Sequence, residues 1–211
     1  MVLKSKEDRV GPFRYILKQG EKPSEAVNAI FASGADTRLE CNSMMVAIQY
    51  YAMLKELGPD DFDQLFAGGY NLVIEPVGKA PMPIPTVKVP IAHPLGSAGL
   101  YEQVLIGGVD DLLPGDWVYF RNLPDYITHN PGGLWSGEHA VYLGDKKFSG
   151  FGQTTQKKTE AQMNELLLQE YNSDAPVDVN TIEEAKERAR NVGSSFGMDE
   201  VALRPITKEI K

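Results

Sequence analysis

Apolar residues follow the spacing of helices in the first third of the chain. Few polar positions interrupt them between residues 41 and 57, which predicts a central, buried helix that stops at Gly58-Pro59. A shorter helix is expected from Pro23 to about residue 31, and another over residues 59–66, with acids in its first turn. Three helices are therefore predicted before residue 70.

The pattern changes between residues 71 and 114. Residues 72–74 have the composition of a strand, and prolines then recur at positions 76, 81, 83, 85, 90 and 94. Such a density of proline suppresses helices and central strands, because the ring fixes φ and removes a backbone N–H. We expect an irregular loop with pieces of edge strand here.

Strand patterns return after a turn at residues 114–116. Apolar and aromatic residues predict strands over 117–120 and 138–143. Gly144-Asp145 then marks a tight turn into residues 147–151, which indicates a hairpin.

Helices are predicted again in the last quarter of the chain. One is expected around residues 158–170, and a capping box at Thr181 and Glu184 starts another that runs to about Arg190. Helices combined with antiparallel strands are typical of an α+β fold.

Composition narrows the range of partners. The 211 residues carry a net charge of −8, which argues against nucleic acid or an anionic membrane surface as the main partner. No run of about 18 apolar residues is present, so no membrane span is expected. The start of the chain is charged and lacks an apolar stretch, so no signal peptide is visible and cytoplasmic synthesis is expected.

Cys41 is the single cysteine of the sequence, and it lies at the start of the predicted apolar helix. The positive end of a helix and its unpaired N–H groups lower the pKa of a thiol and can hold a developing oxyanion. The alternative is an inert Cys41, because cysteine is commonly a small buried hydrophobe. Cys41 is therefore the candidate nucleophile.

A cysteine at a helix start, followed by an antiparallel sheet, is the layout of papain-like thiol enzymes, whose base projects from a strand toward the sulfur. In cell-wall endopeptidases of that class, a Gly-Asp turn opens one strand and the next strand begins with the base. Counting back from Leu143-Gly144 puts the base position on Glu138, with His139 one residue later. Neighbouring side chains of a strand point to opposite faces, so only one of the two can face Cys41.

Several stretches of the chain occur in an order that is characteristic of one family. They are Phe13-Arg14-Tyr15-Ile16-Leu17-Lys18, Pro23-Ser24-Glu25-Ala26, Ser33-Gly34, Glu40-Cys41, Tyr50-Tyr51-Ala52-Met53-Leu54, Gly58-Pro59-Asp60-Asp61-Phe62, Gly115-Asp116-Trp117-Val118-Tyr119-Phe120-Arg121-Asn122, and Trp135-Ser136-Gly137-Glu138 with Leu143-Gly144. With these stretches the chain resembles the small bacterial transglutaminases of Bacillus spore coats, which are protein-glutamine gamma-glutamyltransferases. The similarity extends from residue 12 to residue 152 and is interrupted between residues 70 and 110.

The resemblance implies roles for individual residues. Cys41 would be the nucleophile and Glu138 its acid/base partner, in place of the histidine of papain-like peptidases. Glu40 would be a second carboxylate that shares or backs up that role, and His139 stays the alternative base.

The resemblance also implies an acyl transfer that needs no metal and no organic cofactor. The thiolate would attack the carboxamide of a protein-bound glutamine, release ammonia and pass the acyl group to a lysine amine. Trp135, Trp117 and Asn42 are expected to line the substrate cleft. No acidic loop of calcium-binding spacing is visible, so a calcium-independent enzyme is expected.

Three departures from the family are visible. Forty residues precede Cys41, fewer than the family carries, which leaves the substrate surface unassigned. The family has a histidine on the strand after the base, whereas residues 147–151 contain none. The residue after the base is an amide in the family and is His139 here. The third catalytic member is therefore unassigned.

We expect an α+β, papain-like thiol-enzyme fold with the nucleophile helix packed on an antiparallel sheet. Residues 1–155 are expected to form the catalytic domain, and residues 156–211 a helical extension packed on the same domain. The expected partners are proteins that bear glutamine and lysine side chains. The spore coat, or delivery as an effector, is the expected place of action.

Other functions stay open at this point. A related enzyme that passes the acyl group to water, such as a glutamine deamidase or a cell-wall peptidase or amidase, is the first alternative. A toxin or effector module and an inert binding domain are the others. Glutamate rather than histidine at the base position favours the transferase.

Overall fold

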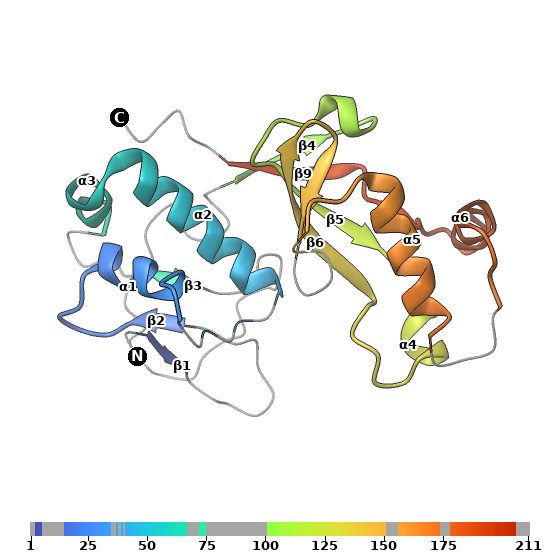
Figure 1. Cartoon of the computed structure of the whole chain (residues 1–211), viewed down its shortest axis with the longest axis horizontal. Helices are drawn as coiled ribbons and strands as arrows, with labels where there is room; N and C mark the ends of the chain where they lie inside the picture. The colour runs from blue at the N-terminus through green and yellow to red at the C-terminus, as the bar shows by residue number, and fades with distance from the viewer. Residues whose placement is uncertain are drawn as a thin grey trace. The chain divides into compact units, whose positions relative to one another are not determined.

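Two units make up the chain: Met1–Glu102 with Pro205–Lys211, and Gln103–Arg204 (Figure 1). The computed structural model describes residues 3–5, 15–34, 37, 39, 41–66, 72–74, 101–150, 156–173 and 178–205.

Three helices dominate the first unit: α1 (Pro23–Ile30), α2 (Cys41–Leu57) and α3 (Pro59–Gln64). They pack against one another, and each matches a helix that the hydrophobic pattern predicted. The buried side of α2 carries Met45, Val46, Ala47, Tyr50 and Leu54. The central, buried helix expected after the cysteine is therefore confirmed.

A small antiparallel sheet belongs to the same unit. Its strands are β1 (Leu3–Ser5), β2 (Tyr15–Leu17) and β3 (Val73–Ile74), in that order. The hydroxyl of Tyr50 on α2 donates to the Val73 carbonyl at 3.3 Å, so α2 packs against β3. The strand at residues 72–74 was predicted, whereas β1 and β2 are too short to show a periodic pattern.

The first turn of α1 receives its cap from another helix. The Ser24 backbone N–H donates to Asp63 Oδ1 at 2.7 Å, and the Ser24 hydroxyl donates to Asp63 Oδ2 at 2.9 Å. A carboxylate is favourable there because it satisfies an N–H group at the positive end of the helix. On α2, Tyr51 packs against Phe31 with ring centroids 4.6 Å apart.

The second sheet has six strands: β4 (Tyr101–Leu105), β5 (Trp117–Arg121), β6 (Gly137–Gly144), β7 (Lys147–Ser149), β8 (Gly197–Met198) and β9 (Val201–Pro205). Its order is β4-β9-β5-β6-β7, and β8 also pairs with β5. β5 is antiparallel to β6, β8 and β9. The predicted strands over residues 117–120 and 138–143 are confirmed. β8 and β9 were not predicted, because they are short and begin next to a glycine and an acid.

The same unit contains the helices α4 (Tyr126–His129), α5 (Glu160–Tyr171) and α6 (Ile182–Asn191), and a 3₁₀ turn at Val109–Asp111. The capping box at Thr181 is present as predicted, and Thr159 with Gln162 forms another at the start of α5. Both satisfy N–H groups that a helix start leaves unpaired.

Alternate residues of β5 and β6 face the core of this unit. Val118 and Phe120 of β5 and Ala140 of β6 are buried with Met163 and Leu167 of α5. The residues between them, such as Tyr119 and His139, lie on the opposite face and are half-buried. The pattern of the strands thus places successive side chains on different faces.

The hairpin between β6 and β7 is confirmed, and its turn lies one residue later than predicted. Asp145 and Lys146 have φ values of 50° and 55°, the left-handed conformation that a two-residue turn requires. Lys146 also pairs with Asp110, with 2.9 Å between Nζ and Oδ1. A bulge between Tyr142 and Gly144 shifts the register just before the turn.

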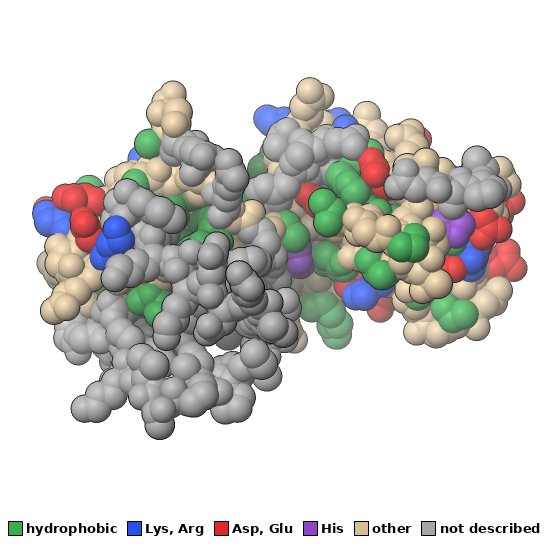
Figure 2. Space-filling model, turned by 90° about the horizontal axis from the view of Figure 1, so that it is seen from below, with side chains coloured by type: hydrophobic (Ala, Val, Ile, Leu, Met, Phe, Trp, Pro, Cys, Tyr) green, Lys and Arg blue, Asp and Glu red, His purple; other side chains and the backbone are tan. Residues whose placement is uncertain are grey.

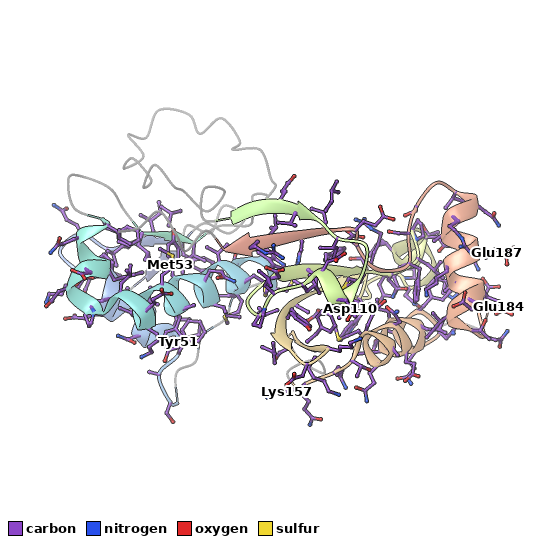
Figure 3. The ribbon with its side chains drawn as sticks, turned by 90° about the horizontal axis from the view of Figure 1, so that it is seen from above. Tyr51, Met53, Asp110, Lys157, Glu184 and Glu187 are labelled. Carbon is purple, nitrogen blue, oxygen red and sulfur yellow. The ribbon has the colours of Figure 1, made fainter. Side chains whose placement is uncertain are left out.

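The outward side of α6 is acidic. Ala185 and Ala189 are fully buried, whereas Glu183, Glu184 and Glu187 are exposed. Glu184 and Glu187 project away from the helix in Figure 3, and acidic side chains gather at this end of the second unit in Figure 2.

The proline-rich segment, residues 75–100, lies outside the described residues. The expected boundary at residue 155 between a catalytic domain and a helical extension stays a prediction. In the structure both α5 and α6 contribute side chains to the core that β5 and β6 share.

Candidate active site

Cys41 is the first residue of α2 and is half-buried. Behind it, the first two turns of the helix bury Ser43, Met45 and Val46, which fix the helix start in place. Backbone N–H groups at a helix start have no partner within the helix and carry partial positive charge. The position suits a thiolate and the oxyanion that forms when it attacks a carbonyl.

Glu40 and the side chain of Asn42, both predicted at the site, lie outside the described residues. The structure therefore describes the candidate nucleophile and the helical backbone of Asn42, but neither Glu40 nor the Asn42 side chain.

Glu138 is the second residue of β6 and is 7% exposed. It lies directly opposite Phe120 in the antiparallel pair with β5, and it shares a face with Ala140. That face is the one that holds the core of the second unit. The side chain of Glu138 is therefore largely shielded from solvent.

His139 lies on the other face of β6, opposite Tyr119 of β5. Its Nδ1 accepts a hydrogen bond from the indole Nε1–H of Trp117 at 2.9 Å. The imidazole centroid is 5.2 Å from that of Trp117 and 4.6 Å from that of Tyr119. The two candidate bases therefore occupy opposite faces and different environments.

The two predicted cleft tryptophans are held by the second unit. Trp117 is 2% exposed, and Trp135 is half-buried against the core. The backbone N–H of Trp135 donates to the Tyr126 hydroxyl at 3.1 Å. Their place at a substrate cleft stays a prediction.

Asn122 is a residue that the sequence reasoning did not single out. Its amide donates to the Trp135 carbonyl at 2.8 Å and to the Leu167 carbonyl of α5 at 3.0 Å, and its N–H donates to the Ser136 carbonyl at 3.1 Å. Asn122 is 1% exposed and fixes the loop that leads into Glu138. An asparagine directly after a strand was the only signal in the sequence.

A separate polar cluster links α4, α5 and α6. Arg188 pairs with Asp178 and with Asp125, where Nη2 and Oδ2 are 2.6 Å apart, and the Tyr171 hydroxyl donates to Asp125 at 3.3 Å. The His129 ring stacks on Tyr171 at 4.2 Å. Burial and the charge of Asp125 raise the pKa of Tyr171 to about 12, and the hydrogen bond from Arg188 lowers the pKa of Asp178. These contacts hold the three helices together.

Across the described residues, no group of three or more histidine, cysteine, aspartate or glutamate side chains is arranged to hold a metal ion. Within the same ranges no helix has both the length and the apolar character needed to cross a membrane.

A family model of protein-glutamine gamma-glutamyltransferases matches residues 8–191. The chain belongs to this family. Annotated relatives bear the same name: a protein of Halalkalibacterium halodurans is 30% identical over 138 residues, which are 65% of this chain and 40% of that protein. One of Bacillus cereus is 33% identical over 144 residues, 65% of this chain and 41% of that protein. The transglutaminase resemblance seen in the sequence is confirmed.

A protein of Bacillus licheniformis with the same name is 29% identical, and 45% of its length is covered. This chain therefore spans less than half of the length of the relatives that it matches. A solved transglutaminase from Geobacillus stearothermophilus, without its C-terminal extension, matches 98% of this chain and 76% of its own length. Its TM-score is 0.63 at 23% identity, which shows that the fold is shared. The α+β, papain-like fold expected from the sequence is confirmed.

Proposed function

We propose that this chain transfers the acyl group of a protein-bound glutamine to a lysine amine, through a thioester on Cys41. One observation carries the proposal: in a member of the gamma-glutamyltransferase family, the single cysteine is the first residue of a buried helix. The family's name and the position of the sulfur support the same chemistry.

The reaction begins with attack of the Cys41 thiolate on the carboxamide carbon of the glutamine. Negative charge develops on the carbonyl oxygen, and N–H groups at the start of α2 stabilise it. Ammonia leaves with one added proton, and the thioester remains. The amine of a lysine then attacks the thioester, loses a proton, and releases the thiolate and the isopeptide-linked product.

Two proton transfers are needed, one to departing ammonia and one from the attacking amine. We assign both to Glu138, because a buried carboxyl group can hold a proton near neutral pH and return it. Glu40, next to the nucleophile in sequence, is proposed as a partial substitute. A helix start stabilises negative charge, so Glu40 is the better candidate for the ionised carboxylate.

The proposed substrates are proteins with accessible glutamine and lysine side chains. The proposed reaction needs no calcium, so activity should be the same after treatment with EDTA. Cytoplasmic synthesis, followed by action on a spore coat or as an effector, is part of the same proposal.

The test is incorporation of a fluorescent primary amine into a glutamine-rich protein, with release of ammonia followed in parallel. A transferase gives both signals in equal amounts. A deamidase releases ammonia with little incorporation of amine, and a peptidase or an inert domain gives neither signal.

A further inference from the structure

An imidazole held between two aromatic rings lies beside Glu138 in sequence and on the opposite face of β6. The Trp117 indole N–H donates to Nδ1 of His139 at 2.9 Å, and the Tyr119 ring centroid is 4.6 Å from that of His139. Tyr119 and His139 are direct partners across the β5–β6 pair.

The hydrogen bond determines where the proton of His139 resides. An indole N–H can only donate, so Nδ1 must accept, and the ring proton of the neutral imidazole is on Nε2. In an imidazolium both nitrogens carry hydrogen, and Nδ1–H would then face the indole N–H. The contact with Trp117 therefore stabilises the neutral imidazole against the cation.

A histidine that serves as the base of a thiol enzyme has the opposite arrangement. Its second nitrogen donates to an acceptor, which stabilises the imidazolium that forms when the thiol loses its proton. Among the described residues of β5, Arg121 carries the charge beside this pair: its guanidinium lies 5.4 Å from the Tyr119 ring, and it forms an ion pair with Asp199. Arg121 and Asp199 neutralise each other through two hydrogen bonds of 3.1 and 2.6 Å.

The same aromatic residues fix the start of β6. A Cβ atom at Gly137 would lie 2.1 Å from the Tyr119 hydroxyl oxygen, so the Tyr119 ring covers Gly137 as well as His139. Both sequence neighbours of Glu138 are thus covered on the face that Glu138 itself does not occupy.

We propose that Trp117, Tyr119 and His139 position Glu138. They hold the imidazole neutral, with its proton on Nε2, and keep β6 in the register that places Glu138 on the opposite face. This inference rests on the proposed function, in which Glu138 carries the protons, and it makes His139 a positioning residue rather than the base.

Nitrogen NMR of the wild-type protein tests the protonation state without any assay of activity. Near pH 6, where an ordinary histidine is largely doubly protonated, we expect one protonated and one unprotonated nitrogen for His139. The Trp117 indole proton should shift downfield because it is hydrogen-bonded. A proton on Nδ1, or a doubly protonated ring near neutral pH, would overturn the inference. If the protein has no transferase activity, this spectrum still decides the protonation state.

Two substitutions of equal size test the positioning role. Asparagine in His139→Asn offers an oxygen near the position of Nδ1, whereas leucine in His139→Leu offers no acceptor. We expect His139→Asn to keep kcat within about threefold, and His139→Leu to lower kcat by about tenfold with KM little changed, the cost of one lost hydrogen bond. Losses of about 10²-fold or more in both variants would identify His139 as the base. Wild-type kcat in His139→Leu would remove the positioning role.

Discussion

Glu138 is 7% exposed and lies opposite Phe120, while its neighbour His139 lies between Trp117 and Tyr119 on the other face of β6. In the proposed mechanism Glu138 carries the transferred protons, whereas His139 stays neutral with its proton on Nε2, so the two side chains have different tasks. At the scale of the residue, this difference in surroundings separates two side chains that the sequence left as rivals.

Replacement of Glu138 by glutamine removes the proposed proton carrier and keeps the shape of the side chain. Glu138→Gln should therefore lower kcat for incorporation of amine by roughly 10²–10⁴-fold, the usual range for loss of general acid–base catalysis. Glu165→Gln, at an exposed position on α5, is the control and should behave like the wild type. Retention of activity within about threefold in Glu138→Gln would assign the proton transfers elsewhere.

Only those candidate site residues that stand out in the local sequence pattern could be predicted. A lone cysteine at a helix start and an acid at the start of a strand are visible in the sequence. The Trp117–His139 hydrogen bond and the anchoring of the Glu138 loop by Asn122 are not visible, because they depend on the register in which β5 pairs with β6 and on the path of the loop between them.

The first residue of β6 connects the elements to the site. The Tyr119 side chain of β5 lies against Gly137. A Cβ atom at this position would lie 2.1 Å from the Tyr119 hydroxyl oxygen and 2.6 Å from the Phe120 carbonyl oxygen. The strand therefore depends on a glycine for the close approach of its neighbour, rather than for an unusual φ.

Gly137→Ala should lower the free energy of unfolding by about 1–3 kcal/mol, because the added methyl group displaces Tyr119 or opens the β5–β6 pair. The measurement is denaturation by urea. Gly108→Ala is the matched control, since a Cβ there meets nothing within 4 Å and the backbone is extended, with φ of 164°. Equal stability of the two variants would show that Tyr119 does not cover Gly137.

Elements were predicted well where they are long or have clear end signals. The apolar run of α2, the capping box of α6 and the aromatic strand β5 all fall where the sequence placed them. β1, β2, β8 and β9 have two to five residues each, too few for a period to emerge, and they exist because a neighbouring strand pairs with them.

At the scale of the whole molecule, the first unit contains Cys41 and the second contains Glu138, and each unit has its own sheet and its own helices. In the second unit, the cluster of Arg188, Asp125 and Tyr171 holds α4, α5 and α6 together. Its ionisable groups make the stability of the unit depend on pH.

Tyr171 is fully buried and has a pKa of about 12, whereas a tyrosine in the unfolded chain ionises near pH 10. The neutral phenol is therefore favoured in the folded state. Its contribution to stability is complete below about pH 10 and is lost as the pH rises through about 12.

Tyr171→Phe removes this ionisation together with one hydrogen bond to Asp125. At pH 7 the variant should be less stable than the wild type by about 1 kcal/mol. Between about pH 10 and pH 12 the wild type should lose stability relative to the variant, so the difference should shrink or reverse. Denaturation of both proteins across this range is the measurement, and a constant difference would contradict the burial of a neutral phenol.

The formation of a thioester on Cys41 tests the central claim most directly. The protein is mixed with a peptide that contains one glutamine and no amine, and its intact mass is measured before an acceptor amine is added. We predict a mass increase equal to the peptide minus ammonia, located on Cys41, discharged by the amine and absent in Cys41→Ala. Incorporation of amine by Cys41→Ala, or an adduct on another residue, would contradict the account.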